Sequence, residues 1–278
     1  MNKIEKTSQI AEARPSRSSL IPSPSLRFVL VRTSHPGNIG AAARAIRTMG
    51  FTRLVLVAPH DYPHPETTAL AVGATDVLDK VVVVPRLVDA IADCTLALGC
   101  TARRRGVALP ELSPRAAAQQ VRAATSGEIA IVFGNERTGL ENDELKLCHA
   151  AVHIPSDPEF PSLNLAQAVQ VLAYELRVAQ LASAAEIDAA ADSEAARPEA
   201  AAKSDPPASA AQMEYFFSHL EQTLDDIDFH KGRSPRTIMQ RLRRLFLRAH
   251  MDEREVRILR GIFDDAQRMA RMAKQREK

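Results

Sequence analysis

The chain has 278 residues, of which 45% are hydrophobic and 25% charged, with a net charge of +2. This is enough for a large and a small domain, and because Trp is absent and aromatics make up only 4%, the core must be aliphatic. No apolar run reaches the roughly 18 residues of a membrane span. Three cysteines without a CxxC pair argue against a disulfide framework or zinc site and favour a reducing, cytoplasmic location.

Apolar runs and helical segments alternate between residues 26 and 182. Residues 1–25 are polar and Pro-containing, so we expect a disordered tail without a signal peptide. Apolar runs predict strands at 28–31, 54–57, 81–84, 95–98, 129–133 and 152–154. Helical spacing predicts helices at 39–49, 65–72, 86–91, 114–124, 141–148 and 163–181. Continuous apolar strands are buried on both faces, so residues 26–182 are predicted to form a doubly wound, mostly parallel α/β domain.

The C-terminal third differs in composition. Residues 183–211 contain almost no large apolar side chains and are expected to be a flexible acidic linker. Residues 212–278 are expected to form two or three helices as a small extension. Residues 181–230 carry two basic and eleven acidic residues, a net −9, whereas 231–278 carry fifteen basic and six acidic, a net +9. This basic end favours a polyanionic partner, but a solvated helix surface explains it equally well.

The first candidate motif is Asn-Ile-Gly-Ala-Ala-Ala-Arg at residues 38–44, where the first strand gives way to a helix. Free N–H groups at a helix start suit an anion, and Arg44 can grip a phosphate in bidentate fashion. An ordinary turn with a solvated arginine is the alternative. A dinucleotide fingerprint is excluded because no third glycine follows Gly37 and Gly40, and the second strand ends without a carboxylate.

The second motif, Phe-Gly-Asn-Glu-Arg-Thr-Gly-Leu at residues 133–140, follows the fifth strand. Gly134 and Gly139 permit a tight loop with exposed N–H groups. Glu136 is a carboxylate at a strand end, where it either meets a ligand or braces the loop.

The third motif comprises residues 154–155 and the segment Pro-Ser-Leu-Asn-Leu at 161–165. Ser162 is a natural N-cap for the long helix that follows, and Asn164 need only bond locally. All three motifs follow strands, and open α/β sheets bind ligands at the carboxyl ends of their strands. The histidines and cysteines show no metal-ligand spacing, and no nucleophile elbow occurs, so we infer no metal and no Ser/His/Asp triad.

In this order, the three motifs resemble the signature motifs of the SPOUT-class RNA 2'-O-methyltransferases. In particular, they resemble the bacterial members that methylate cytidine or uridine 32 in the tRNA anticodon loop. The resemblance covers residues 26–182 and, more weakly, 212–265. It implies a trefoil knot in the C-terminal part of the α/β domain, a cytoplasmic homodimer, and tRNA as substrate. The implied methyl donor is S-adenosyl-L-methionine, which leaves as S-adenosyl-L-homocysteine.

The resemblance also implies roles for individual residues. Cofactor contacts fall on Cys100, Thr101, Ala102, Gly134, Gly139, Ile154, Pro161, Ser162 and Leu163. Catalytic roles fall on Arg44, Ser162 and Asn164. RNA contacts fall on Asn38, Arg44, Arg103, Arg105, Glu136, Arg241 and Arg244. The last two belong to the basic helical extension, which the resemblance implies binds tRNA. Because a guanidinium stays protonated, we expect Arg44 to hold a phosphate and stabilise negative charge rather than act as a base.

Three alternatives remain open from the sequence. They are a methyltransferase for another tRNA or rRNA nucleotide, a non-catalytic RNA-binding protein on the same fold, and a nicotinamide-dependent oxidoreductase. The missing fingerprint counts against the last, and the retained Arg44 and 161–164 segment count against the second.

Overall fold

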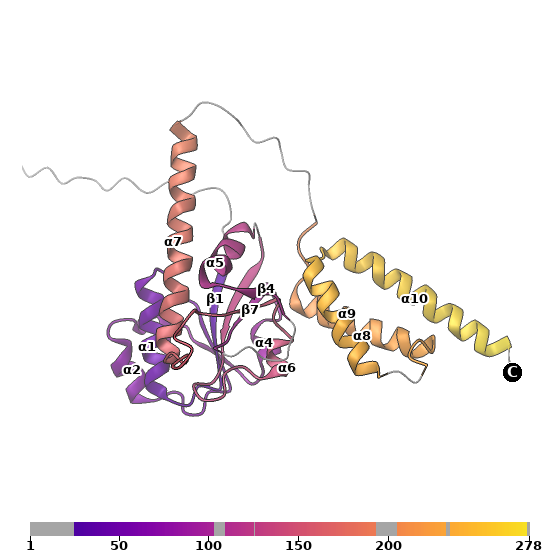
Figure 1. Ribbon diagram of the computed structural model, residues 1–278, viewed down its shortest axis with the longest axis horizontal. Helices are drawn as coiled ribbons and strands as arrows, with labels where there is room; N and C mark the ends of the chain where they lie inside the picture. Colours follow the sequence, from indigo (N-terminus) through magenta and orange to yellow (C-terminus); the bar gives the residue numbers. More distant parts are fainter. Residues whose placement is uncertain (1–24, 103–108, 125, 193–204, 232–233, 277–278) are drawn as a thin grey trace, which may run out of the picture.

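The computed structural model describes residues 25–102, 109–124, 126–192, 205–231 and 234–276. An α/β unit and a group of three C-terminal helices lie side by side (Figure 1). None of the described helices combines the length and hydropathy that crossing a bilayer requires.

Among the described residues, seven strands form one sheet in the order β3-β2-β1-β6-β4-β7-β5, and all neighbouring pairs are parallel. The strands are β1 (Ser25–Val31), β2 (Leu54–Val57), β3 (Val82–Val84), β4 (Cys94–Cys100), β5 (Glu111–Leu112), β6 (Glu128–Phe133) and β7 (Ala150–Val152). The predicted parallel α/β sheet is therefore confirmed. The expectation that every strand is buried on both faces is wrong for β3, because this edge strand leaves Val82 54% and Val83 51% exposed.

Helices cover both faces of the sheet. Those of the α/β unit are α1 (Pro36–Thr48), α2 (Pro65–Ala71), α3 (Thr75–Leu78), α4 (Leu87–Ala90), α5 (Pro114–Ala123), α6 (Asn142–Leu145) and α7 (Leu165–Asp192). Successive strand side chains point to opposite faces, so Phe28 and Leu30 pack in the core beneath α1, α5 and α7, whereas Val29 and Val31 pack beneath α4 and α6. The trefoil knot implied by the resemblance stays a prediction.

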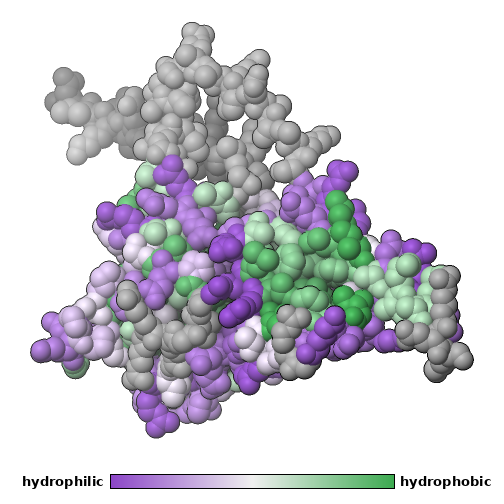
Figure 2. All heavy atoms as spheres, turned by 45° about the vertical axis from the view of Figure 1, so that its right-hand side comes forward, coloured by the Kyte–Doolittle hydropathy of each residue, from purple (hydrophilic) through white to green (hydrophobic). Residues whose placement is uncertain are grey.

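The C-terminal helices are α8 (Ala210–Asp226), α9 (Pro235–Ala249) and α10 (Glu253–Arg276), which pack around a separate core centred on Phe216. Figure 2, in which this part of the molecule comes forward, shows an apolar area bordered by hydrophilic side chains. Exposed apolar side chains of these helices include Tyr215, Leu245, Ile258, Ile262, Met269 and Met272.

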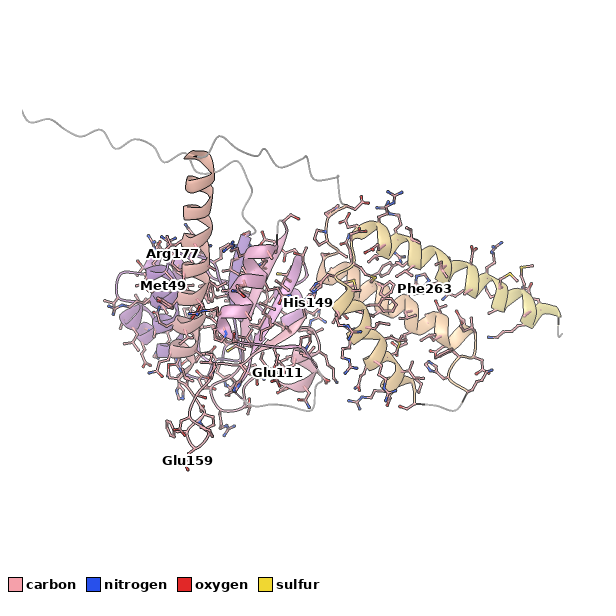
Figure 3. The ribbon with its side chains drawn as sticks, turned by 45° about the horizontal axis from the view of Figure 1, so that its top comes forward. Met49, Glu111, His149, Glu159, Arg177 and Phe263 are labelled. Carbon is pink, nitrogen blue, oxygen red and sulfur yellow. The ribbon has the colours of Figure 1, made fainter. Side chains whose placement is uncertain are left out.

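The two units meet beside β4 and β7. The N–H of Ala211 at the start of α8 donates to the carbonyl of Ala92, just before β4. His149 lies at this junction (Figure 3), and its ring stacks on that of His250 with centroids 6.1 Å apart. Burial and the neighbouring His250 lower the pKa of His149 to about 4, and its Nδ1 accepts a hydrogen bond from the N–H of Ala97, as only an unprotonated ring nitrogen can. His149 is therefore neutral at physiological pH and serves packing.

Helix α1 reaches its position because Gly40 lets α2 approach closely. A Cβ at Gly40 would lie 2.1 Å from the carbonyl oxygen of Thr67 and 3.0 Å from the nitrogen of Ala71. A Cβ added at Gly261, in α10, would meet no neighbouring heavy atom within 4 Å. A side chain would therefore clash with α2 at Gly40 but would meet open space at Gly261.

We expect Gly40→Ala to lower the free energy of unfolding by about 1–3 kcal/mol, because α2 must move away from α1. Gly261→Ala is the matched control and should raise it by about 0.5–1 kcal/mol, because alanine stabilises an open helix. Urea denaturation of both variants measures the two changes. Equal effects of the same sign would contradict the packing described for α1 and α2.

Candidate active site

A cavity of about 280 Å³ opens at the carboxyl ends of β4, β6 and β7. It brings together all nine residues predicted to contact the cofactor, from three loops distant in sequence. They are Cys100, Thr101, Ala102, Gly134, Gly139, Ile154, Pro161, Ser162 and Leu163. Glu136, predicted to contact RNA, lines the same cavity. The sequence-based assignment of single residues missed six others that complete the lining, most of them inside or beside the motifs: Phe133, Asn135, Arg137, Thr138, Leu165 and Ala168.

The lining fits a nucleoside-bearing methyl donor such as S-adenosylmethionine. Most of the cavity surface is apolar, which suits an adenine ring, while the loop backbones offer N–H and C=O groups for its polar edge. Burial raises the pKa of the Cys100 thiol to about 12, so this side chain contributes shape rather than a nucleophilic thiolate. Within the described ranges, no group of three or more His, Cys, Asp or Glu residues is arranged to hold a metal ion.

The 134–139 loop closes tightly on itself. A Cβ at Gly134 would lie 2.1 Å from the nitrogen of Leu140, and Gly139 has a φ of 67°. Glycine is therefore needed at both positions, for space at the first and for left-handed backbone at the second. The Asn135 amide braces the loop by donating to the carbonyl of Arg32 at 2.6 Å and accepting from the N–H of Arg137 at 2.9 Å.

A chain of side-chain hydrogen bonds connects the three motifs. Asn164 Nδ2 donates to Asn38 Oδ1 at 3.0 Å, and Asn38 Nδ2 donates to Glu136 Oε1 at 2.9 Å. The backbone N–H groups of Ser34 and His35 also donate to the Glu136 carboxylate, at 2.9 and 3.1 Å. Glu136 therefore braces the site, and the fold brings one residue of each motif into direct contact.

These donors also determine the protonation of Glu136. Partial burial raises its pKa, but the hydrogen bonds from Asn38 and from the N–H groups of Ser34 and His35 outweigh burial, so the pKa lies below its ordinary value of 4.5. The carboxylate is thus charged at neutral pH and accepts hydrogen bonds.

Ser162 does not cap the long helix, contrary to the sequence-based expectation. Helix α7 begins at Leu165, and the side chain of Asn164 accepts from the N–H groups of Ala166 at 2.9 Å and Gln167 at 3.4 Å. Asn164 is therefore the capping residue. The exposed hydroxyl of Ser162 instead lines the cavity, on a loop that projects from the molecule near Glu159 (Figure 3).

Arg44 is not among the residues that line the cavity. It lies on the exposed side of α1 and makes no hydrogen bond or ion pair with another residue in the described part of the chain. Of the three residues predicted to be catalytic, Ser162 thus lines the cavity, Asn164 lies beside it in contact with Asn38, and Arg44 of the same chain lies outside it.

The remaining predicted RNA contacts lie elsewhere. Arg103 and Arg105 fall outside the described residues. Arg241 and Arg244 are exposed on α9, where they line a groove between α9 and α6. Arg243 between them is committed to an ion pair with Glu214 and lies 4.3 Å over the ring of Phe217, so it stabilises the helical unit.

Two family comparisons cover the two units. Residues 25–174 match the SpoU rRNA Methylase family, and residues 211–276 match the C-terminal domain of the tRNA methyltransferase TrmJ.

Whole-chain relatives agree with this division. The chain is 46% identical to the tRNA (cytidine/uridine/adenosine-2'-O-)-methyltransferase TrmJ of Pseudomonas aeruginosa, over 88% of this chain and 95% of that one. It is 45% identical to the tRNA (cytidine/uridine-2'-O-)-methyltransferase TrmJ of Salmonella typhimurium, over 85% of this chain and 94% of that one. The crystal structure of TrmJ from Z. mobilis superposes with a TM-score of 0.71 at 34% identity, covering 87% of this chain and 98% of that one. The chain therefore belongs to the SpoU methylase family and, within it, to the TrmJ tRNA methyltransferases.

Proposed function

We propose that this protein methylates the 2'-hydroxyl of a tRNA ribose, at cytidine or uridine 32 of the anticodon loop. The observation that carries the proposal has two parts: the second and third motifs line one apolar cavity, and the Asn164–Asn38–Glu136 hydrogen bonds join the first motif to them. The tRNA 2'-O-methyltransferase activity of its relatives and their match to both units support it. Methylation of another tRNA or rRNA nucleotide is the alternative.

S-adenosyl-L-methionine supplies the methyl group: the bond from the 2'-oxygen to the methyl carbon forms, the carbon–sulfur bond breaks, and the hydroxyl proton is released. The chain's own residues align these atoms, and good orientation contributes up to about 7–11 kcal/mol. Ser162 and Asn164 orient donor and ribose, and Glu136 holds Asn38, to which Asn164 is hydrogen-bonded. Arg44 grips the phosphate and stabilises negative charge at the 2'-oxygen.

We infer that the enzyme acts as a homodimer in which Arg44 of one copy serves the cavity of the other. Arg44 is exposed and lies outside the cavity of its own chain. Exposed Tyr174, Val178 and Leu181, spaced to share one side of α7, offer an apolar surface close to α1. A tRNA substrate and free thiols at all three cysteines support a cytoplasmic location.

The target nucleotide is tested with purified protein and tRNA transcripts. A tRNA carrying 2'-deoxycytidine at position 32 alone should accept no methyl group, while its ribose counterpart should accept one per molecule. Mass spectrometry of nuclease digests locates the methylated nucleotide. Methyl incorporation at another position would exclude nucleotide 32 and favour the alternative.

Arg44→Ala should lower the rate of methyl transfer by about 10²–10³-fold, as expected for loss of a charge-stabilising donor. The affinity for S-adenosylhomocysteine, measured by titration calorimetry, should stay unchanged because Arg44 does not line the cofactor cavity. A large loss of this affinity would show that Arg44 binds the cofactor instead.

A mixing experiment tests the shared site. Arg44→Ala and Ser162→Ala proteins should each be inactive, but a mixture allowed to exchange subunits should regain roughly a quarter of wild-type activity. Half the dimers are then mixed, and one of their two sites is intact. If each chain used its own Arg44, mixing would restore nothing.

Glu136→Gln should destabilise the protein at pH 7 by about 1–3 kcal/mol, because an amide leaves N–H donors of the site unpaired. The wild-type advantage should shrink as pH falls through and below 4.5, since the depressed pKa means that this stability is lost when the carboxylate is protonated. Urea denaturation at a series of pH values measures the difference. A difference that grows on acidification would refute the assignment of a charged carboxylate.

A further inference from the structure

A second cavity, of about 420 Å³, lies beside the cofactor cavity, and its size falls within the range of ligand pockets. The two cavities share one wall, the loop residues Asn135, Glu136, Arg137 and Thr138. The second cavity is completed by Arg32, Ser34, His35, His60 and Glu141.

The topology of the sheet makes this position informative. The lining segments follow the carboxyl ends of β1, β2 and β6. From the boundary between β1 and β6, the order runs through β2 to β3 on one side and through β4 and β7 to β5 on the other. Such a boundary is a topological switch point, where open α/β sheets bind ligands. The cofactor cavity lies further along, at β4, β6 and β7, so the switch point is left for a second ligand.

Some side chains that line this cavity already have hydrogen-bond or ion-pair partners among the described residues, and others do not. The Glu136 carboxylate accepts three hydrogen bonds, and Arg32 forms ion pairs with Glu141 and Glu144. In contrast, the exposed side chains of His35, His60 and Arg137 form no hydrogen bond or ion pair with any residue that the structure describes. The guanidinium of Arg137 and the imidazoles of His35 and His60 are therefore available to donate hydrogen bonds to a ligand.

We propose that this second cavity binds a backbone phosphate of the RNA, next to the nucleotide whose ribose enters the active site. The inference rests on the proposed function and adds a substrate subsite to it. The planar fork of Arg137 matches two phosphate oxygens, and His60 supplies a further donor from the end of β2. Phosphate contacts fix the register of a nucleic acid on a protein. A phosphate held here positions the ribose across a single loop from the methyl donor.

The test uses full-length Arg137→Ala and the double variant with His60→Ala. Lys80→Ala is the control, because it removes an exposed positive charge. Lys80 precedes the amino end of β3, whereas the cavity lies at the carboxyl ends of the strands. Binding of tRNA is measured by fluorescence anisotropy over a series of salt concentrations, with S-adenosylhomocysteine saturating. Loss of the Arg137 contact should weaken tRNA binding about ten- to hundredfold and reduce the log–log salt slope by about one. Arg137→Lys should restore the slope but only part of the affinity, because the charge returns without the fork.

Three further readouts separate the possible outcomes. Calorimetry with S-adenosylhomocysteine should give wild-type affinity for His60→Ala alone, because His60 lines the second cavity and not the cofactor cavity; a selective loss of this affinity would mean that the second cavity serves the cofactor and would overturn the proposal. Wild-type tRNA affinity and salt slope in the double variant would overturn it as well. Inorganic phosphate should compete with tRNA more weakly in the double variant than in the wild type, and equal competition would also count against it. If the wild-type protein itself failed to methylate tRNA, the proposed function would fall rather than this subsite alone.

Discussion

The site depends on the hydrogen bonds that run from Asn164 through Asn38 to Glu136. Asn164 and Asn38 are 126 positions apart in the chain, and Asn38 and Glu136 are 98 apart. The parallel sheet makes the meeting possible, because it places the carboxyl ends of β1, β6 and β7 at the same edge. Each motif alone is an ordinary turn at the end of a strand. Their connection fixes Glu136, and with it one wall of the cofactor cavity.

Much of this arrangement was predictable from the sequence. The apolar runs of β1, β2 and β6 are long enough to indicate buried parallel strands, and the motif order indicates which loops converge. The nine cofactor contacts, which the family resemblance implies, line one cavity because they lie at or after the carboxyl ends of β4, β6 and β7. Their chemical roles stay predictions, because the fold shows where side chains lie and not what they bind.

Other features depend on tertiary contacts that a pattern cannot report. Strand β5 has only two residues, too few for any periodicity, and β3 has the composition of a buried strand but lies at an edge. Ser162 and Asn164 are both good capping residues, and only the path of the entering chain selects Asn164. Arg44 lies in a recognisable motif, but periodicity does not reveal whether it faces the cavity of its own chain. Within α9, only the structure separates Arg243, which pairs with Glu214, from the exposed Arg241.

The loop from Asn135 to Thr138 walls two cavities, and this has a thermodynamic consequence. Any shift of the loop that improves one cavity for its occupant alters the other, so the two occupancies are energetically linked. Linkage is reciprocal: a donor that tightens the grip on the polynucleotide must itself be held more firmly once the polynucleotide is in place. After the methyl group has moved, the spent donor no longer offers the same contacts. If the two cavities are occupied as proposed, release of the methylated tRNA and release of the by-product are coupled through the residues of this one loop.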